Sequence, residues 1–331
     1  MLEPARIRSP RLRALLALSC TCALWGLSFS TMKALGLHLS NLDPKVSTWF
    51  VAAATLVVRF AASALLVGLR GLPRPTRAEL QQGLWMGLFT GAGMLFQMDA
   101  LSFTSASTSA FLTQGYVVIL PIFSALAARR WPSLKIVICA LTIAAGLGTL
   151  SGFDWVRLRL GRGETETLLA ALCFAFQILL LDRRAFRGNR TGVVSVSMFA
   201  CIALLLLPVA IWSARSSADM KLLAATPIAV ALLFLLSVPS TTIAFSLMNR
   251  YQPELSASEA GIIYGAEPVF ASILALFLPG ILQAFAHVDY PNEVLGSRLL
   301  VGGGLVVIAN VLLQLPFGAR RPSEQEAREL N

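Results

Sequence analysis

Charged side chains are scarce in this sequence of 331 residues. Only 13% of the residues are Asp, Glu, Lys or Arg, whereas a soluble domain usually carries about 25%. With so few charges, the chain has too little polar surface to cover a globule of this size in water. Since 56% of the residues are hydrophobic, a fibrous or disordered chain is excluded as well. The composition indicates a protein that crosses a membrane several times.

Residues that bind metals or cofactors are also rare. The sequence has two histidines, and its five cysteines all lie inside apolar runs without a C-x-x-C pair. These residues are His38, His287, Cys20, Cys22, Cys139, Cys173 and Cys201. We therefore expect no metal site and no cofactor, and we interpret the cysteines as small buried apolar side chains.

Motifs that carry out chemistry are missing too. No G-x-x-x-x-G-K-[ST] phosphate loop is present, which argues against direct coupling to ATP. A membrane-embedded transferase enzyme is an alternative, but the chain lacks the paired aspartates, histidine cluster or G-x-S-x-G motif that such enzymes use. A channel is a further alternative, and no carbonyl filter sequence supports it. These absences favour a protein that moves a solute over one that transforms it.

Ten long apolar runs dominate the chain instead. Each is close to the roughly 20 residues that a helix needs to cross the hydrocarbon core of a bilayer. The runs are 13–36, 46–69, 81–103, 106–128, 133–152, 165–182, 192–214, 226–248, 256–278 and 296–316. Because the connections are short, consecutive helices are expected to run antiparallel. The sequence predicts an all-α integral membrane protein with ten transmembrane helices, the first of them an uncleaved signal anchor.

Lysine and arginine are distributed unevenly between the two ends of these runs. With the N-terminus inside and ten crossings, 18 of them lie in cytoplasmic segments and 7 in outer segments, while Lys33 and Arg59 lie within spans. Three outer arginines in the loop 153–164 run against this rule. The net charge of +10 is therefore a topology signal rather than a nucleic-acid surface. We expect a plasma-membrane protein of the bacterial inner-membrane type with both termini in the cytoplasm.

The ten runs divide into two sets of five near residue 155. Because five is odd, the second set enters the membrane with the opposite polarity, as in an inverted repeat. The fourth run has a small-residue stretch at 105–110 and Pro-Ile-Phe at 121–123; the ninth has a similar stretch at 255–260 and Pro-Val-Phe at 268–270. The predicted repeats are residues 12–152 and 160–317, and the predicted cytoplasmic tails are residues 1–11 and 318–331.

Short motifs in the first, fourth and ninth runs add a specific likeness. They are Trp25-Gly26-Leu27-Ser28-Phe29 with Lys33, the segments 104–106, 110–113 and 116–118, and the segment 267–271. In this order and spacing they resemble the drug/metabolite transporter superfamily, in its EamA-type branch of paired five-helix repeats. The resemblance implies a secondary transporter, an exporter of small metabolites such as amino acids or related compounds. A nucleotide-sugar carrier of the same superfamily is the alternative within this class.

The chain departs from that family pattern at two loops. The family often has a Gly-Glu pair after helices four and nine. This chain has Arg129-Arg130-Trp131 at the first place, and a long insert at 279–295 at the second.

Two charged residues near the middle of predicted spans are the leading site candidates. Charge inside a bilayer costs about 2.5–3.5 kcal/mol on insertion scales, so it is rarely kept without a use. Glu267, in the ninth run, is expected to bind a proton or a cationic group of a small-molecule substrate. Arg59, in the second run, is expected to hold a carboxylate or Glu267 itself. A structural ion pair between helices is the alternative for both residues.

Further candidates follow from polar residues at depth. Lys33 and Asp99 lie near the outer ends of their runs, where they are expected to pair or to reach the interface. The hydroxyls of Ser105, Ser109, Thr113 and Tyr116 share one helix face, and they favour either a wetted pathway or bonds between helices. Gln97, Tyr264 and, through the family motif, Trp25 complete the candidate substrate or proton site.

Prolines and glycines predict where helices break and pack. Pro268 directly follows Glu267, and Pro239 lies in a polar stretch of the eighth run; both are expected to interrupt their helices. Glycines four residues apart allow close helix packing, within one chain or between copies, so the oligomeric state stays open. These glycines are Gly83, Gly87, Gly91, Gly261 and Gly265.

Overall fold

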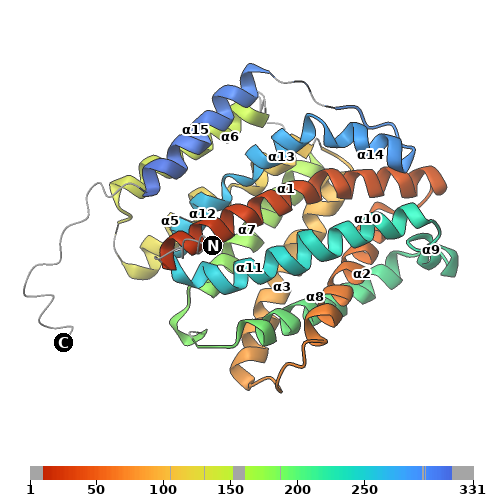
Figure 1. The fold of residues 1–331 in the computed structure, drawn as a ribbon, viewed down its shortest axis with the longest axis horizontal. Coiled ribbons are helices and arrows are strands. Elements are labelled where there is room, and N and C mark those ends of the chain that lie inside the picture. The colour runs from red at the N-terminus through yellow and green to blue at the C-terminus, as the bar shows by residue number, and fades with distance from the viewer. Residues whose placement is uncertain are drawn as a thin grey trace, which may run out of the picture.

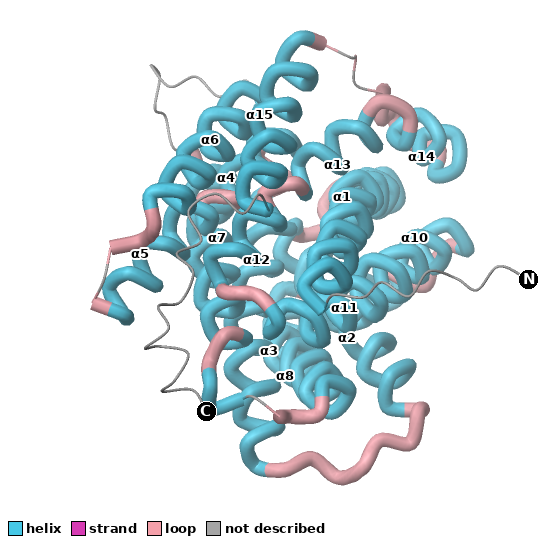
Figure 2. The backbone as a smooth tube through the Cα atoms, turned by 60° about the vertical axis from the view of Figure 1, so that its left-hand side comes forward, coloured by secondary structure: helices cyan, strands magenta, loops and turns pink. Residues whose placement is uncertain are grey.

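The computed structural model describes residues 10–104, 106–129, 131–151, 161–186, 188–292, 294 and 296–314. All regular structure in these segments is helical, and they contain no β-strand (Figure 2). Most of the two predicted tails, residues 152–160 and Ser105 lie outside them. The prediction of an all-α fold is confirmed for the described part of the chain.

Seven of the ten predicted runs each coincide with one continuous helix. These helices are α1 (Pro10–Leu42), α2 (Thr48–Gly68), α3 (Arg77–Ala100), α6 (Leu134–Ser151), α7 (Arg162–Leu181), α8 (Thr191–Ser213) and α15 (Ser297–Gln314). Apolar runs become helical in a bilayer because a helix satisfies its backbone polar groups internally. With 33 residues, α1 is about 50 Å long at 1.5 Å per residue, so it extends beyond the hydrocarbon core.

The other three predicted runs are interrupted helices. The fourth run forms α4 (Ala106–Thr113) and α5 (Tyr116–Ala128), and the ninth forms α12 (Ala257–Tyr264) and α13 (Glu267–Ala275). The eighth forms α10 (Pro227–Ser237), a π-helical segment η2 (Val238–Ile243) and α11 (Ala244–Tyr251). All three interruptions lie well inside the predicted spans, where freed backbone groups are tolerated only if protein surrounds them.

Two further helices lie where the sequence predicts loops. They are α9 (Ser217–Leu222) and α14 (Leu278–Ala286), and single 3-10 turns form η1 (Arg184–Phe186) and η3 (Gln252–Glu254). The prediction of a loop throughout 279–295 is therefore wrong for its first part. Proline at the second position of α14 lacks only an N–H that has no partner in a first turn, so it starts this helix well. Ile281 and Phe285 lie on its exposed face.

Length and hydropathy identify five helical segments in the described residues that are able to cross a membrane. A sixth is counted if α12 and α13 are taken together with α14, which bends away by 60°. The interrupted eighth run is one of the five, as the segment Pro227–Glu254, whereas α4 and α5 are too short to be counted singly. The chain is therefore a multi-pass membrane protein, and the number of ten crossings stays a prediction.

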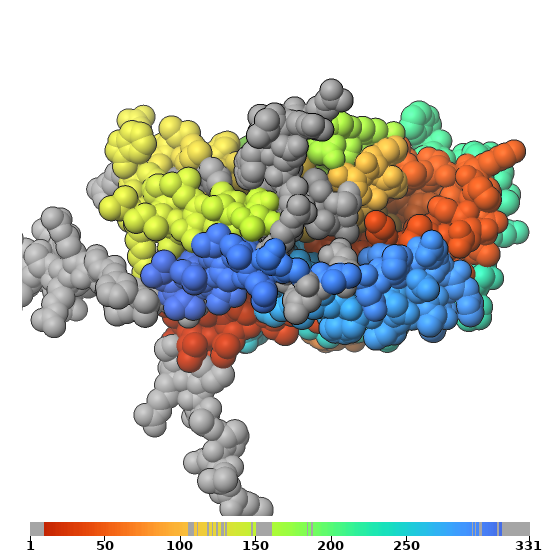
Figure 3. Space-filling model, turned by 90° about the horizontal axis from the view of Figure 1, so that it is seen from above, coloured from red at the N-terminus to blue at the C-terminus, as the bar shows by residue number. Residues whose placement is uncertain are grey.

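Helices from the two halves pack against each other in matched pairs. The second helix of each half meets its counterpart, α2 with α8, and the fifth does the same, α6 with α15 (Figure 1). The first helix of the second half, α7, packs on α3, and α1 packs correspondingly on α10 and α11. Figure 3 shows the surfaces of α6 and α15 in contact along one side of the molecule. Such pairing is what a two-fold relation between the halves would produce.

The glycines of α3 lie at its contact with α8. A Cβ added at Gly83 would lie 2.4 Å from Ser197 Cβ, and one added at Gly87 would lie 2.7 Å from Cys201 Cβ. Gly91 is one turn farther along the same contact, next to Ile202. Gly261 meets Leu120 of α5 and Gly265 meets Ile143 of α6 in the same way. These glycines therefore serve packing inside the chain.

Arg215 connects two loops at one end of the helix bundle. Its guanidinium binds Asp219 through two bonds, with Nη2 at 2.7 Å from Oδ1 and Nε at 3.1 Å from Oδ2. It also pairs with Asp43, which follows α1. This guanidinium lowers the pKa of both carboxyl groups from their usual values.

Acid is expected to weaken this loop connection. A carboxyl whose pKa is lower in the folded state stabilises the fold above its unfolded pKa of about 3.9, and it loses that effect as the pH falls through the folded pKa. Arg215→Gln should therefore lower the melting temperature at neutral pH and have a smaller effect near pH 3. Arg250→Gln is the control, because the described contact of Arg250 is with the ring of Tyr251. An Arg215→Gln effect independent of pH would contradict the electrostatic account.

Candidate substrate site

Two interrupted helices meet at the centre of the molecule. The break between α4 and α5 is Gln114-Gly115, and that between α12 and α13 is Gly265-Ala266. In the second break the N–H of Gly265 still bonds back to Gly261 and Ile262, so the first half-helix ends in a tight turn. Pro268 lies in the first turn of α13, where its missing N–H costs nothing. The predicted interruption is present, and it begins three residues before the proline.

A side-chain hydrogen bond joins the two breaks. Gln114 Nε2 donates to Glu267 Oε2 at 3.2 Å. Glu267 is 6% exposed and Gln114 is 2% exposed, so both are screened from solvent. A buried carboxylate needs such a donor, since an unpaired one would lose the hydration of its charge without any replacement. The amide is neutral, so it satisfies one oxygen of Glu267 without neutralising its charge.

Glu267 lines a central cavity of about 50 Å³. That volume accommodates a few water molecules and is far below the roughly 300–1,000 Å³ of ligand pockets, so a solute requires the helices to move apart. The other lining residues are Trp25, Ser28, Phe29, Met94, Gln97, Thr113, Tyr116, Phe174, Gln177, Ile178, Phe245, Met248 and Tyr264. Among these lining residues Glu267 is the one carboxylate, and six of the other thirteen are aromatic. No metal-binding group of His, Cys, Asp or Glu occurs among the described residues.

Six of the sequence candidates lie on the wall of this cavity. They are Trp25, Gln97, Thr113, Tyr116, Tyr264 and Glu267. Gln97 Nε2 donates to Thr113 Oγ1 at 3.0 Å, which fixes the amide of α3 against the end of α4. Ser109 does not reach the cavity; its hydroxyl lies 3.3 Å from Thr167 Oγ1 of α7. For Ser109, the interpretation as a bond between helices therefore fits better than that of a wetted pathway.

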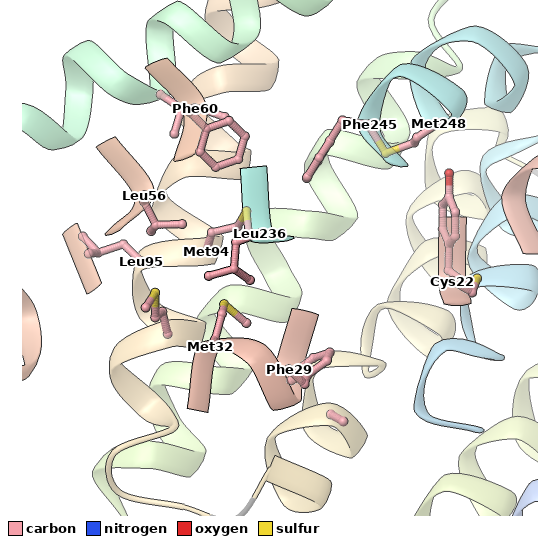
Figure 4. Close-up of a cluster of buried hydrophobic side chains, with 14 of the residues drawn as sticks. Cys22, Phe29, Met32, Leu56, Phe60, Met94, Leu95, Leu236, Phe245 and Met248 are labelled. Atoms are coloured by element: carbon pink, nitrogen blue, oxygen red, sulfur yellow. The ribbon is translucent and has the colours of Figure 1, made fainter. Parts of the chain in front are cut away.

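Several cavity residues were not singled out from the sequence. Phe174, Phe245, Met94 and Met248 are apolar residues of apolar helices, and nothing in their spacing distinguishes a cavity wall from an ordinary core. Figure 4 shows Phe29, Met94, Phe245 and Met248 among the packed side chains of this region. Their place on the cavity wall follows from the breaks in α4/α5 and α12/α13, and no local pattern in the sequence marks it.

Arg59 lies elsewhere. It is fully buried on α2, and its Nε donates to Thr241 Oγ1 and its Nη2 to Ser240 O at 3.3 Å. Both acceptors belong to η2, where the wider π-helical turn after Pro239 presents a carbonyl and a hydroxyl to α2. The expectation that Arg59 holds Glu267 is therefore wrong in this conformation. The prediction that Pro239 interrupts its helix agrees with the position of η2.

Lys33 and Asp99, predicted to lie near the outer ends of their runs, do not pair with each other. Asp99 pairs with Arg162 Nη2 at 2.5 Å, and Arg162 lies over the ring of Phe103, 4.1 Å from its centroid. Lys33 Nζ lies 6.0 Å from the centroid of the Tyr290 ring. A Lys33–Asp99 pair is thereby excluded here. Arg162 is one of the arginines that run against the topology rule, and it pairs with both Asp99 and Glu166.

Tyr264 closes the cavity toward η3, the side assigned to the cytoplasm by the arginine distribution. Its hydroxyl donates to Gln252 Oε1 at 2.9 Å, and Gln252 Nε2 donates to Ile178 O at 3.0 Å. The ring of Trp25 lies 5.4 Å from that of Tyr264, centroid to centroid. These contacts connect α12, η3, α7 and α1 below Glu267.

Removing the Tyr264 hydroxyl is expected to loosen this closure. Tyr264→Phe leaves Gln252 Oε1 buried without its donor, which costs about 1–3 kcal/mol in this conformation. Buried Cys22, which lies against Ile263 O on the same side, should then react faster with a maleimide in nanodiscs. Tyr251→Phe is the control, since the described contact of Tyr251 is through its ring. Equal Cys22 rates in wild type and Tyr264→Phe would show that the hydroxyl does not hold the closure.

Known proteins are similar to this chain in sequence and in fold. The model of the EamA-like transporter family matches residues 12–152 and 162–313. The chain belongs to the EamA-like transporter family. An "Uncharacterized transporter" of Archaeoglobus fulgidus is 26% identical over 301 residues, which are 91% of this chain and 87% of that protein. A protein solved by crystallography has the same fold, with a TM-score of 0.67 and 17% identity over 92% of this chain and 97% of the other.

This membership confirms the resemblance inferred from the motifs in helices one, four and nine. The family model matches this chain twice, once in each half, in keeping with a two-repeat architecture. The protein is thus a multi-pass membrane transporter, and a small-molecule substrate follows from the family.

Proposed function

We propose that this EamA-like transporter is a secondary transporter that exports small metabolites, such as amino acids or related compounds. Transport proceeds by alternating access around the central cavity, and protons are the coupling ion. Export is the direction that the family resemblance implies. The proposed site comprises Glu267, the aromatic residues Trp25, Tyr116 and Tyr264, and the polar pair Gln97 and Thr113.

The position of Glu267 carries the proposal. Its side chain lies in the cavity, and among the described residues its hydrogen-bond partner is the neutral amide of Gln114. A carboxylate without a cationic partner in a membrane interior is costly, and such residues in transporters commonly mark an ion or substrate pathway. A proton and the ammonium group of a solute compete for the same carboxylate, so binding of one releases the other. Such competition couples a proton flux to an opposite flux of solute.

The aromatic wall supports a solute that is partly apolar and carries a cationic group. The rings of Trp25 and Tyr264 and that of Phe245 lie close together, with Trp25 and Phe245 centroids 5.2 Å apart. Aromatic faces attract cations, and the attraction increases when water is excluded. Trp25, Tyr264 and Glu267 together therefore favour an amine next to an apolar body.

The proposed topology places ten crossings in the plasma membrane, as two inverted repeats at 12–152 and 160–317. Both termini are proposed to be cytoplasmic, because basic residues concentrate in that set of loops. The breaks in α4/α5 and α12/α13 support the inversion, since they occupy corresponding helices of the two halves and meet at one cavity.

A reconstituted efflux assay tests this function. Purified protein in liposomes loaded with a mixed metabolite library should release a selected set of solutes, identified by mass spectrometry. An opposing proton gradient should accelerate their release relative to liposomes without a gradient. Empty liposomes supply the background rate. Folded protein that releases nothing above this background would refute the proposal, and selective efflux that ignores the gradient would refute its proton-coupled part.

A further inference from the structure

A second, larger cavity lies one helical turn from the central one, and we name it the outer vestibule. Its volume is about 610 Å³, within the range of ligand pockets. It is bordered by the end of α1, the beginning of α2 and the end of α3, with Lys33, Ser40, Thr48, Val51, Met98 and Ser102 among its lining residues. The topology proposed above places this end of the three helices at the outer face.

Lys33 is the one charged residue among the described residues that line the outer vestibule. The nearest acidic residues on the same elements are already engaged: Asp99 binds Arg162 and Asp43 binds Arg215, and each of these arginines also binds a second carboxylate, Glu166 or Asp219. The described contact of the Lys33 ammonium is with the face of the Tyr290 ring at 6.0 Å, near the limit of such interactions. The Lys33 ammonium is therefore the charged group that the described wall presents to an occupant, and its N–H groups are able to donate hydrogen bonds to an anion.

A second cation, Arg59, lies behind the lining residue Met32 of the outer vestibule. Arg59 Nη1 lies 3.5 Å from the sulfur of Met32, and Met32 itself lines the vestibule. The described partners of the Arg59 guanidinium are neutral: a hydroxyl, a carbonyl and this thioether. Its charge thus acts across Met32 on whatever occupies the vestibule, in surroundings where little water screens it.

The two cavities are stacked along the same two helices. Phe29 and Met94 line the central cavity, whereas Met32, Lys33 and Met98 line the vestibule. Four residues along a helix correspond to about 6 Å, so the separation is close to the length of one small solute. Apolar side chains form the partition, and methionine has three rotatable bonds that let it move aside. Figure 4 shows Phe29, Met32 and Met94 in this part of the core.

We propose that the outer vestibule is a second solute site, which binds an anionic group through Lys33. It takes a carboxylate or a phosphate, with the hydroxyls of Ser40, Thr48 and Ser102 as further hydrogen-bonding groups. Charge of opposite sign in the two cavities then fits a solute with a cationic and an anionic end, the former at Glu267 and the latter at Lys33. This last step rests on the proposed function, whereas the anion site itself does not.

The chain has four lysines, which makes a direct test of the anion site practical. Protein in nanodiscs is treated with an amine-acylating reagent, and the modification rate of each lysine is followed by peptide mass spectrometry. N-acetylleucine is the anionic probe, inorganic phosphate is the second anion, and N-acetylleucinamide is the neutral control of equal shape. Lys45, exposed in the loop after α1, and Lys221, exposed on α9, are internal controls. Ionic strength is kept constant in all samples, because salt screens surface charges.

An anion that occupies the vestibule most of the time should slow acylation of Lys33 by about three-fold or more. Lys45 and Lys221 should keep their rates, and N-acetylleucinamide should change none of them. Protection by phosphate alone would identify a phosphate group, and protection by N-acetylleucine a carboxylate. Unchanged Lys33 rates with both anions, or equal slowing of all three lysines, would overturn the proposal. Since no transport is measured, a failed efflux assay and a failed protection assay are distinguishable.

Discussion

Replacing Glu267 by glutamine should reduce proton-driven efflux at least about ten-fold, which corresponds to the loss of some 1.4 kcal/mol or more of coupling. Glutamine has nearly the same shape and still accepts the hydrogen bond from Gln114 Nε2, so the break between α12 and α13 is expected to persist. The variant cannot take up or release a proton, and it cannot neutralise an ammonium group. Efflux from liposomes with and without a proton gradient measures this effect.

Glu254→Gln is the matched control for Glu267→Gln. It removes one negative charge from an exposed position in η3, and it should leave efflux and the melting temperature unchanged. A Glu267→Gln protein that melts at the wild-type temperature and still responds fully to the gradient would remove Glu267 from the coupling mechanism. A Glu267→Gln protein that exchanges solute faster but no longer responds to the gradient would also support a role of Glu267 in coupling.

Replacing Gly26 by valine should destabilise the protein by about 1–3 kcal/mol or more, the usual cost of forcing extra atoms into a packed interior. Gly26 lies where α1 crosses α13, and a Cβ there would lie 2.8 Å from the backbone nitrogen of Ala271. Backbone atoms cannot rotate out of the way as a side chain does. The two helices therefore have to separate next to the central cavity, and the melting temperature in detergent should fall by several degrees.

Gly36→Val on the same helix provides the control. No atom lies within 4 Å of a Cβ added at Gly36, so valine there meets open space and should leave the melting temperature near that of wild type. Equal melting temperatures for both variants would mean that α1 and α13 do not approach each other as closely as described. Stability is the quantity to compare, because Gly36 lines the outer vestibule and valine there could narrow it.

The positions of the helices were largely predictable from the sequence, and the environment of each side chain was not. Long apolar runs mark depth in the membrane, and all ten predicted runs coincide with a helix or an interrupted helix. Depth alone placed Arg59 and Glu267 at the same level. Depth gave no information on the direction in which each side chain points, and the Arg59 side chain packs on η2 instead of Glu267. Likewise, α14 is only nine residues long, too short to stand out beside runs of 20.

The polar part of the central cavity was predictable from depth in the membrane, and Trp25 from the family motif. Glu267, Gln97 and Thr113 stand out because polar groups at depth are costly. The break at Gln114-Gly115 was missed because it contains no proline and a glycine in a transmembrane run is common. Phe174 and Phe245 belong to the wall only because two helices stop short nearby, which is a property of the assembled fold rather than of any local pattern.

The two breaks also differ in one respect that bears on direction. Tyr116 is the first residue of α5 and Glu267 is the first residue of α13. At corresponding positions after the two breaks, one half therefore has a phenol and the other an acid. Two identical halves that exchange conformations would give two states of equal free energy, one open to each side. An ionisable group on one half alone removes that degeneracy, because protonation then favours one state over the other. Under the proposed proton coupling, the populations of the two open states of the protein would thus vary with pH.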